Sequence, residues 1–209
     1  MEKRVTYSSS NSYTTVNENT AQTTTVWMAF HGMGYLSRYF SRYFRKLNNE
    51  EHYIIIPQAP SKYYQNNKFT HVGASWLTRE DTQEEMTNVL HYLDAIWEVE
   101  KPREDQRLIV MGYSQGVSIA TRWMARRQIK CDHLLLHSGG IPVELTSSDF
   151  EYLKGETPVT YLYGTEDPYI NEARKTEQSL KGSQLFGDRL IIETFSGAHE
   201  VNVDFLSNL

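Results

Sequence analysis

The sequence RLIVMGYSQGVSIATRWMAR, residues 107–126, decides the fold of this chain. Its apolar run at 108–111 shows no polar alternation and is followed by glycine, which is typical of a buried strand. Apolar residues then recur at helical spacing, at Val117, Ala120, Trp123 and Met124. The stretch therefore predicts a strand, a sharp turn and a helix in direct succession.

The turn itself is Gly112-Tyr113-Ser114-Gln115-Gly116, which matches the G-x-S-x-G pattern of a nucleophile elbow. In this pattern the serine occupies a strained conformation, and the flanking glycines let neighbouring backbone pass close to it. The hydroxyl of Ser114 would lie at the start of the helix, where free N–H groups favour negative charge. Because five-residue patterns arise by chance, the strand before it and the helix after it give this match its weight.

Length and composition narrow the class of protein. With 209 residues, of which 39% are hydrophobic and 22% charged, the chain is expected to form a single domain over 1–209. A net charge of −5 and the lack of a lysine or arginine cluster argue against a nucleic-acid partner. A single cysteine excludes an internal disulfide, and no run of 18 apolar residues predicts a membrane span. The N-terminus lacks the apolar core of a signal peptide, so we expect a cytoplasmic protein.

Strand and helix signals alternate along the rest of the chain. Tyrosine, valine and threonine in residues 1–23 predict an edge hairpin, with a disordered tail as the alternative. Thr82-Gln83-Glu84-Glu85 is a capping box that predicts the start of a helix, and 58–75 is a long polar loop. Further strands are predicted at 24–30, 53–56, 134–136, 159–163 and 190–195. This alternation favours an α/β fold with a mostly parallel central sheet.

Polar side chains gather just after the predicted strands, where sites form in parallel sheets. Ser114 follows the strand at 108–111, Asp167 follows the strand at 159–163, and His199 follows the strand at 190–195. The chain order of serine, aspartate and histidine is the order expected of an α/β-hydrolase. In such a triad the histidine accepts the proton of the serine, and the aspartate holds the imidazole in the right tautomer. No metal or organic cofactor takes part.

On these residues the chain resembles the phospholipase/carboxylesterase family of small serine hydrolases, which includes the acyl-protein thioesterases. The matching segments span roughly 26–200 and are His31 to Gly34, Pro57 to Pro60, Ser75-Trp76, Gly112 to Gly116, Ser138-Gly139, Gly164 with Asp167, and Gly197 to His199. The resemblance implies an α/β-hydrolase fold with helices on both sheet faces and no cap domain. It also implies ester or thioester substrates, the triad of Ser114, Asp167 and His199, and an oxyanion hole from the backbone N–H groups of Met33 and Gln115.

The chain departs from the pattern of the family at three places, namely Tyr35, Val117 and the pair Leu77-Thr78. They lie near the expected acyl pocket. The identity of the substrate is therefore not determined by the resemblance, whereas the type of reaction is unaffected. Aromatic residues in or beside the loops of the site are candidate substrate contacts, with ordinary packing as the alternative: Tyr35, Tyr63, Tyr64 and Trp76. The segment between 136 and 159 is too short for a helical lid domain, which favours short to medium acyl chains. Longer chains would need another wall, from the 61–75 loop or from a second copy in a homodimer.

Several alternatives remain at this point. Glu166 competes with Asp167 as the acid, and His137 is the rival base, although it precedes the acid in the chain. His31 ends a strand and is expected to brace a loop. A thioesterase shares the acyl-enzyme chemistry of a carboxylesterase, so sequence does not separate them. A hydrolase fold that binds a small molecule without turnover is disfavoured, because all three members of the triad are present.

Overall fold

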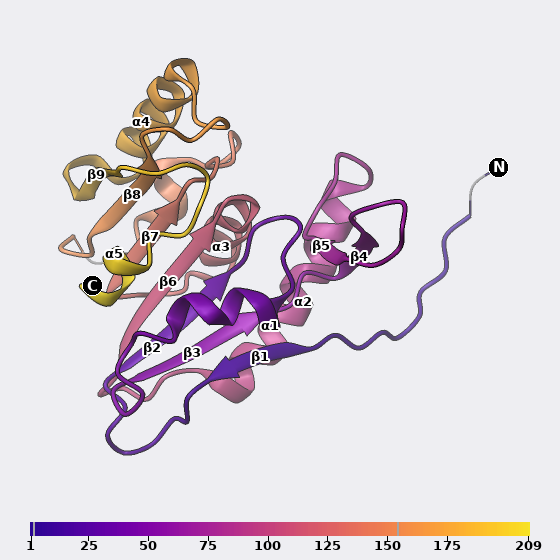
Figure 1. Ribbon diagram of the computed structural model, residues 1–209, viewed down its shortest axis with the longest axis horizontal. Coiled ribbons are helices and arrows are strands. Elements are labelled where there is room, and N and C mark those ends of the chain that lie inside the picture. The colour runs from indigo at the N-terminus through magenta and orange to yellow at the C-terminus, as the bar shows by residue number, and fades with distance from the viewer. Residues whose placement is uncertain (2, 154) are drawn as a thin grey trace.

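In the computed structural model, which describes residues 1, 3–153 and 155–209, a seven-stranded sheet forms the centre of the molecule (Figure 1). Its strand order is β1-β3-β2-β6-β7-β8-β9. β1 is antiparallel to β3, and the other neighbouring strands are parallel. The strands are β1 (Tyr13–Val16), β2 (Thr25–Phe30), β3 (His52–Pro57), β6 (Arg107–Tyr113), β7 (His133–His137), β8 (Val159–Gly164) and β9 (Leu190–Phe195). The mostly parallel α/β sheet is the one the sequence predicts.

Helices cover both faces of the sheet because consecutive residues of its central strands point to opposite sides. In β2, Val26, Met28 and Phe30 belong to one apolar cluster, whereas Trp27 and Ala29 belong to another. The first cluster contains residues of α2 (Thr82–Glu100), α3 (Gln115–Arg127) and α4 (Glu172–Phe186). The second contains residues of α1 (Ser37–Phe40), η1 (Ser41–Phe44) and α5 (Val203–Ser207). Both faces of β2 are thus buried, which is why its sequence shows no polar alternation.

The remaining elements are short. β4 (Ser61–Tyr64) and β5 (Val72–Ser75) form a hairpin inside the segment predicted as a long loop. The 3₁₀-helix η2 (Ser147–Phe150) lies between β7 and β8, and η3 (Gly187–Arg189) lies before β9. Within the described residues, no helix combines the length and the apolar character that crossing a membrane requires. Since both apolar clusters share the same strands, we infer that residues 1–209 form one domain.

Two further local predictions differ from the structure. The edge hairpin predicted in residues 1–23 does not form; in the described part of that segment the one strand, β1, pairs with β3. The hydroxyls of Tyr13 and Tyr53 both donate to the carboxylate of Glu100, which fastens this pair to α2. The capping box does not form either, although the helix begins at Thr82. The N-cap residue is Asp81, which has a φ of 45° and makes no side-chain cap bond; its carboxylate pairs with Arg4.

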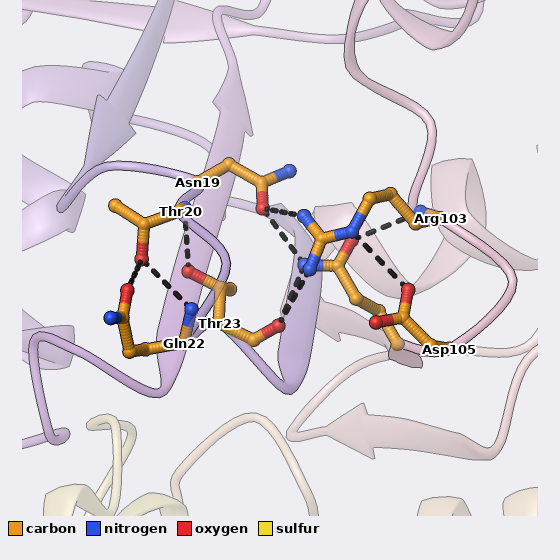
Figure 2. Close-up of polar contacts among 7 residues, drawn as sticks. Asn19, Thr20, Gln22, Thr23, Arg103 and Asp105 are labelled. Atoms are coloured by element: carbon orange, nitrogen blue, oxygen red, sulfur yellow. Dashed lines mark hydrogen bonds and ion pairs between the residues drawn. The ribbon is translucent and has the colours of Figure 1, made fainter.

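Side chains tie together two loops at the amino-terminal ends of the strands (Figure 2). Arg103 donates to the side-chain oxygen of Asn19 and to the carbonyl of Thr23, while Gln106 donates to the same two oxygens. Thr23 in turn accepts from the backbone N–H of Thr20. These bonds satisfy buried polar groups where β2 and β6 begin. This edge of the sheet is thus used for structure. In parallel sheets, the side chains of a functional site lie in loops at the opposite edge, where the strands end.

Truncation of Phe44 to alanine is expected to destabilise the fold. The side chain is fully buried and packs edge-on against Trp27 and Phe40, with ring centroids 5.8 and 5.7 Å away. Loss of a buried phenyl ring typically costs about 3–5 kcal/mol in the free energy of unfolding. Urea unfolding measures the loss. Tyr39→Ala, on the exposed side of the same segment, is the control and should change stability by less than about 0.5 kcal/mol. Equal losses in the two variants would contradict this packing.

Candidate active site

Ser114 lies in the sharp turn that connects β6 to α3. Its φ of 53° and ψ of −121° fall in a region that side-chain-bearing residues rarely adopt. The backbone around it is crowded, because a Cβ at Gly116 would lie 2.0 Å from the carbonyl oxygen of Phe30. A Cβ at Gly112 would lie 2.5 Å from the Cα of Val117. The strand, strained turn and helix predicted from the G-x-S-x-G pattern are therefore all present, and glycine is required at both ends of it.

Three side chains from separate strand ends form one hydrogen-bonded chain. His199 follows β9, and its Nε2 lies 3.0 Å from the Oγ of Ser114. Its Nδ1 lies 2.7 Å from the Oδ2 of Asp167, which follows β8. The other carboxylate oxygen, Oδ1, accepts from the backbone N–H of Tyr169 at 2.8 Å. An Nδ1–H that donates to the carboxylate leaves Nε2 with its lone pair toward the serine hydroxyl.

The three hydrogen-bonded residues differ in how far their side chains are buried. The side chain of Asp167 is fully buried, whereas that of His199 is 19% exposed. Glu166, the rival acid, is exposed to solvent, and the carboxylate that bonds His199 is that of Asp167. His137, the rival base, is fully buried, so its ring offers no surface to a substrate. The structure thus brings together the side chains of Ser114, Asp167 and His199, and the side chains of the two rivals take no part in this set of hydrogen bonds.

The loop with Met33 packs directly against the serine. A Cβ added at Gly32 would lie 3.0 Å from the Cβ of Ser114, and Gly34 donates to the carbonyl of Ala74 at 2.8 Å. Gln115 is the first residue of α3, so its backbone N–H is among the donors that a helix start leaves without an intrahelical partner. The two backbone groups expected to form an oxyanion hole thus belong to a loop that packs next to Ser114 and to the residue that follows it.

Side chains around this loop form a buried brace. Gln115 accepts from the backbone N–H of Trp76 at 2.9 Å and donates to the carbonyl of Leu77 at 2.8 Å. The indole of Trp76 donates to the carbonyl of His31 at 2.8 Å. His31 accepts from the backbone N–H of Ala59 through Nε2, and its Nδ1 lies 2.8 Å from the carbonyl of Gly32. His31 therefore braces the loop, as expected, and the fully buried Trp76 does the same rather than presenting a surface to substrate.

The three tyrosines expected at the rim lie in two places. Tyr35 is half-buried; its hydroxyl bonds that of Tyr43 at 2.8 Å, and its ring packs edge-on against Tyr113. Tyr63 and Tyr64 lie on β4 with exposed rings. Their hairpin is fastened to the loop of Met33, because the amide of Gln65 donates to the carbonyl of Gly34.

Sequence reasoning missed two tyrosines next to His199. The hydroxyl of Tyr113 donates to the carbonyl of His199 at 2.9 Å. The ring of Tyr169 packs edge-on against the imidazole with centroids 4.8 Å apart, and 66% of this residue is exposed. Both are close to a predicted triad residue in sequence: Tyr113 directly precedes Ser114, and Tyr169 lies two residues after Asp167. That adjacency was the available signal.

The buried histidines are neutral because burial disfavours the charged imidazole. Burial lowers the pKa of His31 to about 4 and that of His137 to about 3. The backbone bonds of these rings also require an unprotonated Nε2 as acceptor. Among the described residues, no group of three or more histidine, cysteine, aspartate or glutamate side chains is arranged to hold a metal ion.

Stability is expected to fall as the pH is lowered from about 6.5 toward 4. The pKa values of His31 and His137 are lower in the folded than in the unfolded chain, so the unfolded chain binds more protons in this range. At pH 5 this costs about 2 kcal/mol of unfolding free energy for each of the two residues. Urea unfolding at pH 7 and pH 5 measures the difference in unfolding free energy between the two pH values. In His31→Gln this difference should be smaller by about 2 kcal/mol, the contribution of one histidine. An undiminished difference in that variant would contradict a buried neutral imidazole.

Known proteins resemble this chain in sequence pattern and in fold. The family described as phospholipase/carboxylesterase matches residues 11–209. Acyl-protein thioesterase 2 from Zea mays superposes with a TM-score of 0.68 at 16% identity, covering 95% of this chain and 97% of that one. Esterase PE8 gives a TM-score of 0.68 at 18% identity with coverages of 95% and 96%. A phospholipase/carboxylesterase from Dyadobacter fermentans gives 0.64 at 18% identity with coverages of 97% and 97%. No curated protein sequence matches.

Proposed function

The chain belongs to the phospholipase/carboxylesterase family of α/β-hydrolases, and from this premise we propose that it cleaves carboxylic esters of short to medium acyl chain. The proposed triad is Ser114 as nucleophile, His199 as base and Asp167 as the group that orients the base. The observation that carries the proposal is the pair of contacts of His199, 3.0 Å to Ser114 and 2.7 Å to Asp167. Both are hydrogen-bonding distances; the first spans the path of the proton from serine to His199, and the second lets Asp167 hold the imidazole in place.

The reaction proceeds through an acyl-enzyme. The Oγ of Ser114 forms a bond to the carbonyl carbon while its proton passes to the Nε2 of His199. Collapse of the tetrahedral intermediate breaks the bond to the leaving oxygen, which takes the proton from His199. Water then attacks the acyl-enzyme with the same base and releases the acid. Asp167 stabilises the imidazolium in both halves.

The charge on the tetrahedral oxygen needs donors that are already in place. We assign this role to the backbone N–H groups of Met33 and Gln115, which flank Ser114. Loss of one such donor typically costs about 2.7–4 kcal/mol of barrier. Because both are backbone groups, substituting the side chain of Met33 should leave the donor intact.

The expected preference for short to medium acyl chains is supported by the openness of the rim. Met33 is 60% exposed and Tyr169 is 66% exposed, and the segment between β7 and β8 contributes only η2 among its described residues. We assign acyl contact to Tyr63, Tyr64 and Tyr169, whose rings face solvent beside the site, and a secondary role to the half-buried Tyr35. A cavity of about 840 Å³ between the N-terminal segment and α2 is lined by none of the triad residues.

A substrate panel tests the proposal. The wild-type protein is assayed on p-nitrophenyl acetate, butyrate, octanoate and palmitate, and on thioesters with the same four acyl groups. We expect the highest kcat/KM among the esters at butyrate or octanoate, with a steep fall at palmitate. A higher kcat/KM on the thioester at every acyl length would assign a thioesterase, which shares the acyl-enzyme but differs in leaving group. Turnover of none of the eight compounds would refute a hydrolase acting on acyl groups.

A further inference from the structure

The segment that carries His199 belongs to no helix or strand. Residues 196–202 connect β9 to α5, and the imidazole of His199 projects from their middle. The backbone N–H of Glu166 donates to the carbonyl of Gly197 at 2.9 Å, which fixes the start of the segment to the loop of Asp167. Past that point, the segment needs other contacts to hold the imidazole within reach of Ser114.

One such contact comes from the residue that precedes the nucleophile. Tyr113 is the last residue of β6, and its hydroxyl donates to the backbone carbonyl of His199 at 2.9 Å. Its ring is buried and lies 5.3 Å from the imidazole, centroid to centroid. Burial raises the pKa of this phenol, so the hydroxyl keeps its proton and donates. Because Tyr113 and Ser114 share a peptide bond, this contact sets the position of the base relative to the nucleophile.

A second contact comes from β7, the strand next to β6. The Nε2 of His137 accepts from the backbone N–H of Asn202 at 3.0 Å. An N–H donor at Nε2 places the proton of the neutral ring on Nδ1, which lies 3.0 Å from the Oγ of Ser138 and donates to it. The ring also packs edge-on against Tyr113 and Phe195, with centroids 5.2 and 5.7 Å away. The ring of His137 is thus fixed by Ser138, Tyr113 and Phe195, and it in turn binds the end of the segment at Asn202.

We propose that Tyr113 and His137 are positioning residues that fix the segment of His199 against the strand ends of β6 and β7. The inference rests on the proposed function, since it concerns the base of the proposed triad. Neither residue reaches the reacting atoms: Tyr113 bonds a backbone carbonyl, and His137 bonds a backbone N–H. Their effect is on the distance and direction from Nε2 to the serine hydroxyl. Misplacement by about 1 Å can cost a factor of about 100 in rate, so small shifts of the segment matter.

The experiment uses Tyr113→Phe, which removes one hydroxyl and keeps the ring. Its matched control is Tyr152→Phe, because Tyr152 also donates its hydroxyl to a backbone carbonyl, that of Met124, away from the triad. For the second residue, His137→Gln retains an acceptor for Asn202 and His137→Leu does not. His133→Gln, at the other end of β7, is the control for that pair.

Steady-state kinetics on p-nitrophenyl butyrate give the first readout. We expect Tyr113→Phe to lower kcat by about 10-fold with little change in KM, and Tyr152→Phe to leave both unchanged at similar loss of stability. His137→Leu should lower kcat more than His137→Gln. The double variant Tyr113→Phe/His137→Leu should lose less than the product of the single losses, because both act on one segment. Unchanged kcat in Tyr113→Phe and His137→Leu, or equal losses in the controls, would overturn the inference.

A spectroscopic readout separates this inference from the proposed function. Imidazole ¹⁵N–¹H spectra should show the Nδ1–H tautomer for His199 in the wild type, and exchange broadening of its signals in Tyr113→Phe but not in Tyr152→Phe. If the wild type turns over no ester, the proposed function fails, and the broadening of His199 still decides whether Tyr113 positions it. If the wild type is active and His199 gives the same spectrum in both variants, the positioning role fails alone.

Discussion

Ser114→Ala is expected to lower kcat for p-nitrophenyl butyrate by roughly 10⁴-fold or more, with no loss of folding. The substitution removes one oxygen atom, the one that lies 3.0 Å from the Nε2 of His199. Without it no acyl-enzyme forms, and what remains is the weak effect of binding and of backbone donors on attack by water. The strained φ of 53° costs alanine about as much conformational energy as it costs serine, so the turn should be retained. Initial rates, with circular dichroism and urea unfolding for the fold, measure both parts of this result.

Ser118→Ala is the control for this substitution. Ser118 lies one turn further along α3 and its hydroxyl accepts from Arg122 rather than facing His199. This variant should keep wild-type kcat. If Ser114→Ala also kept it, the nucleophile would be another group, and the mechanism proposed for the triad would fall. A mass increase of one acyl group on the wild type after rapid quenching, absent in Ser114→Ala, would place the intermediate on this residue.

The geometry of the candidate site was largely predictable because the three proposed triad residues follow strand ends. Apolar runs located the strands that precede Ser114, Asp167 and His199, and parallel strands bring their carboxyl ends to one edge. The strained turn was predictable too, because glycines at 112 and 116 are required by close backbone contacts. The topology of a parallel α/β sheet therefore predicts that these three distant segments are neighbours, even when no contact between individual residues is known.

What was not predictable depends on individual contacts between distant residues. Tyr113 and His199 are 86 positions apart, and His137 and Asn202 are 65 positions apart. Composition and periodicity carry no information on such pairs. Trp76 shows the same limit, since its place in a rim loop fitted substrate contact and ordinary packing equally well, and its indole bond to His31 could not be read from the sequence. The same holds for Asp81 at the start of α2, whose carboxylate pairs with Arg4 from the distant N-terminal segment.

Asp167→Asn is expected to lower kcat by about 10⁴-fold, with a small effect on KM. The carboxylate has two partners, the backbone N–H of Tyr169 at Oδ1 and His199 at Oδ2. In the asparagine variant only the amide oxygen can accept from Tyr169, so the NH₂ group must face the imidazole. That group donates to Nδ1 and forces the proton of His199 onto Nε2. The base then presents N–H instead of a lone pair to Ser114, and it cannot accept the proton of the nucleophile.

Glu166→Gln is the matched control, because Glu166 is the neighbouring carboxylate and is exposed. It should retain kcat within about 2-fold, as surface substitutions away from the reacting groups do. Imidazole ¹⁵N–¹H spectra of Asp167→Asn should show His199 with its proton on Nε2, so the tautomer is observed independently of the rate. The opposite pattern, a collapse of kcat in Glu166→Gln with wild-type kcat in Asp167→Asn, would move the acid of the triad by one residue. Loss of kcat in Asp167→Asn with an unchanged tautomer would instead show that Asp167 acts through charge on the imidazolium rather than through orientation.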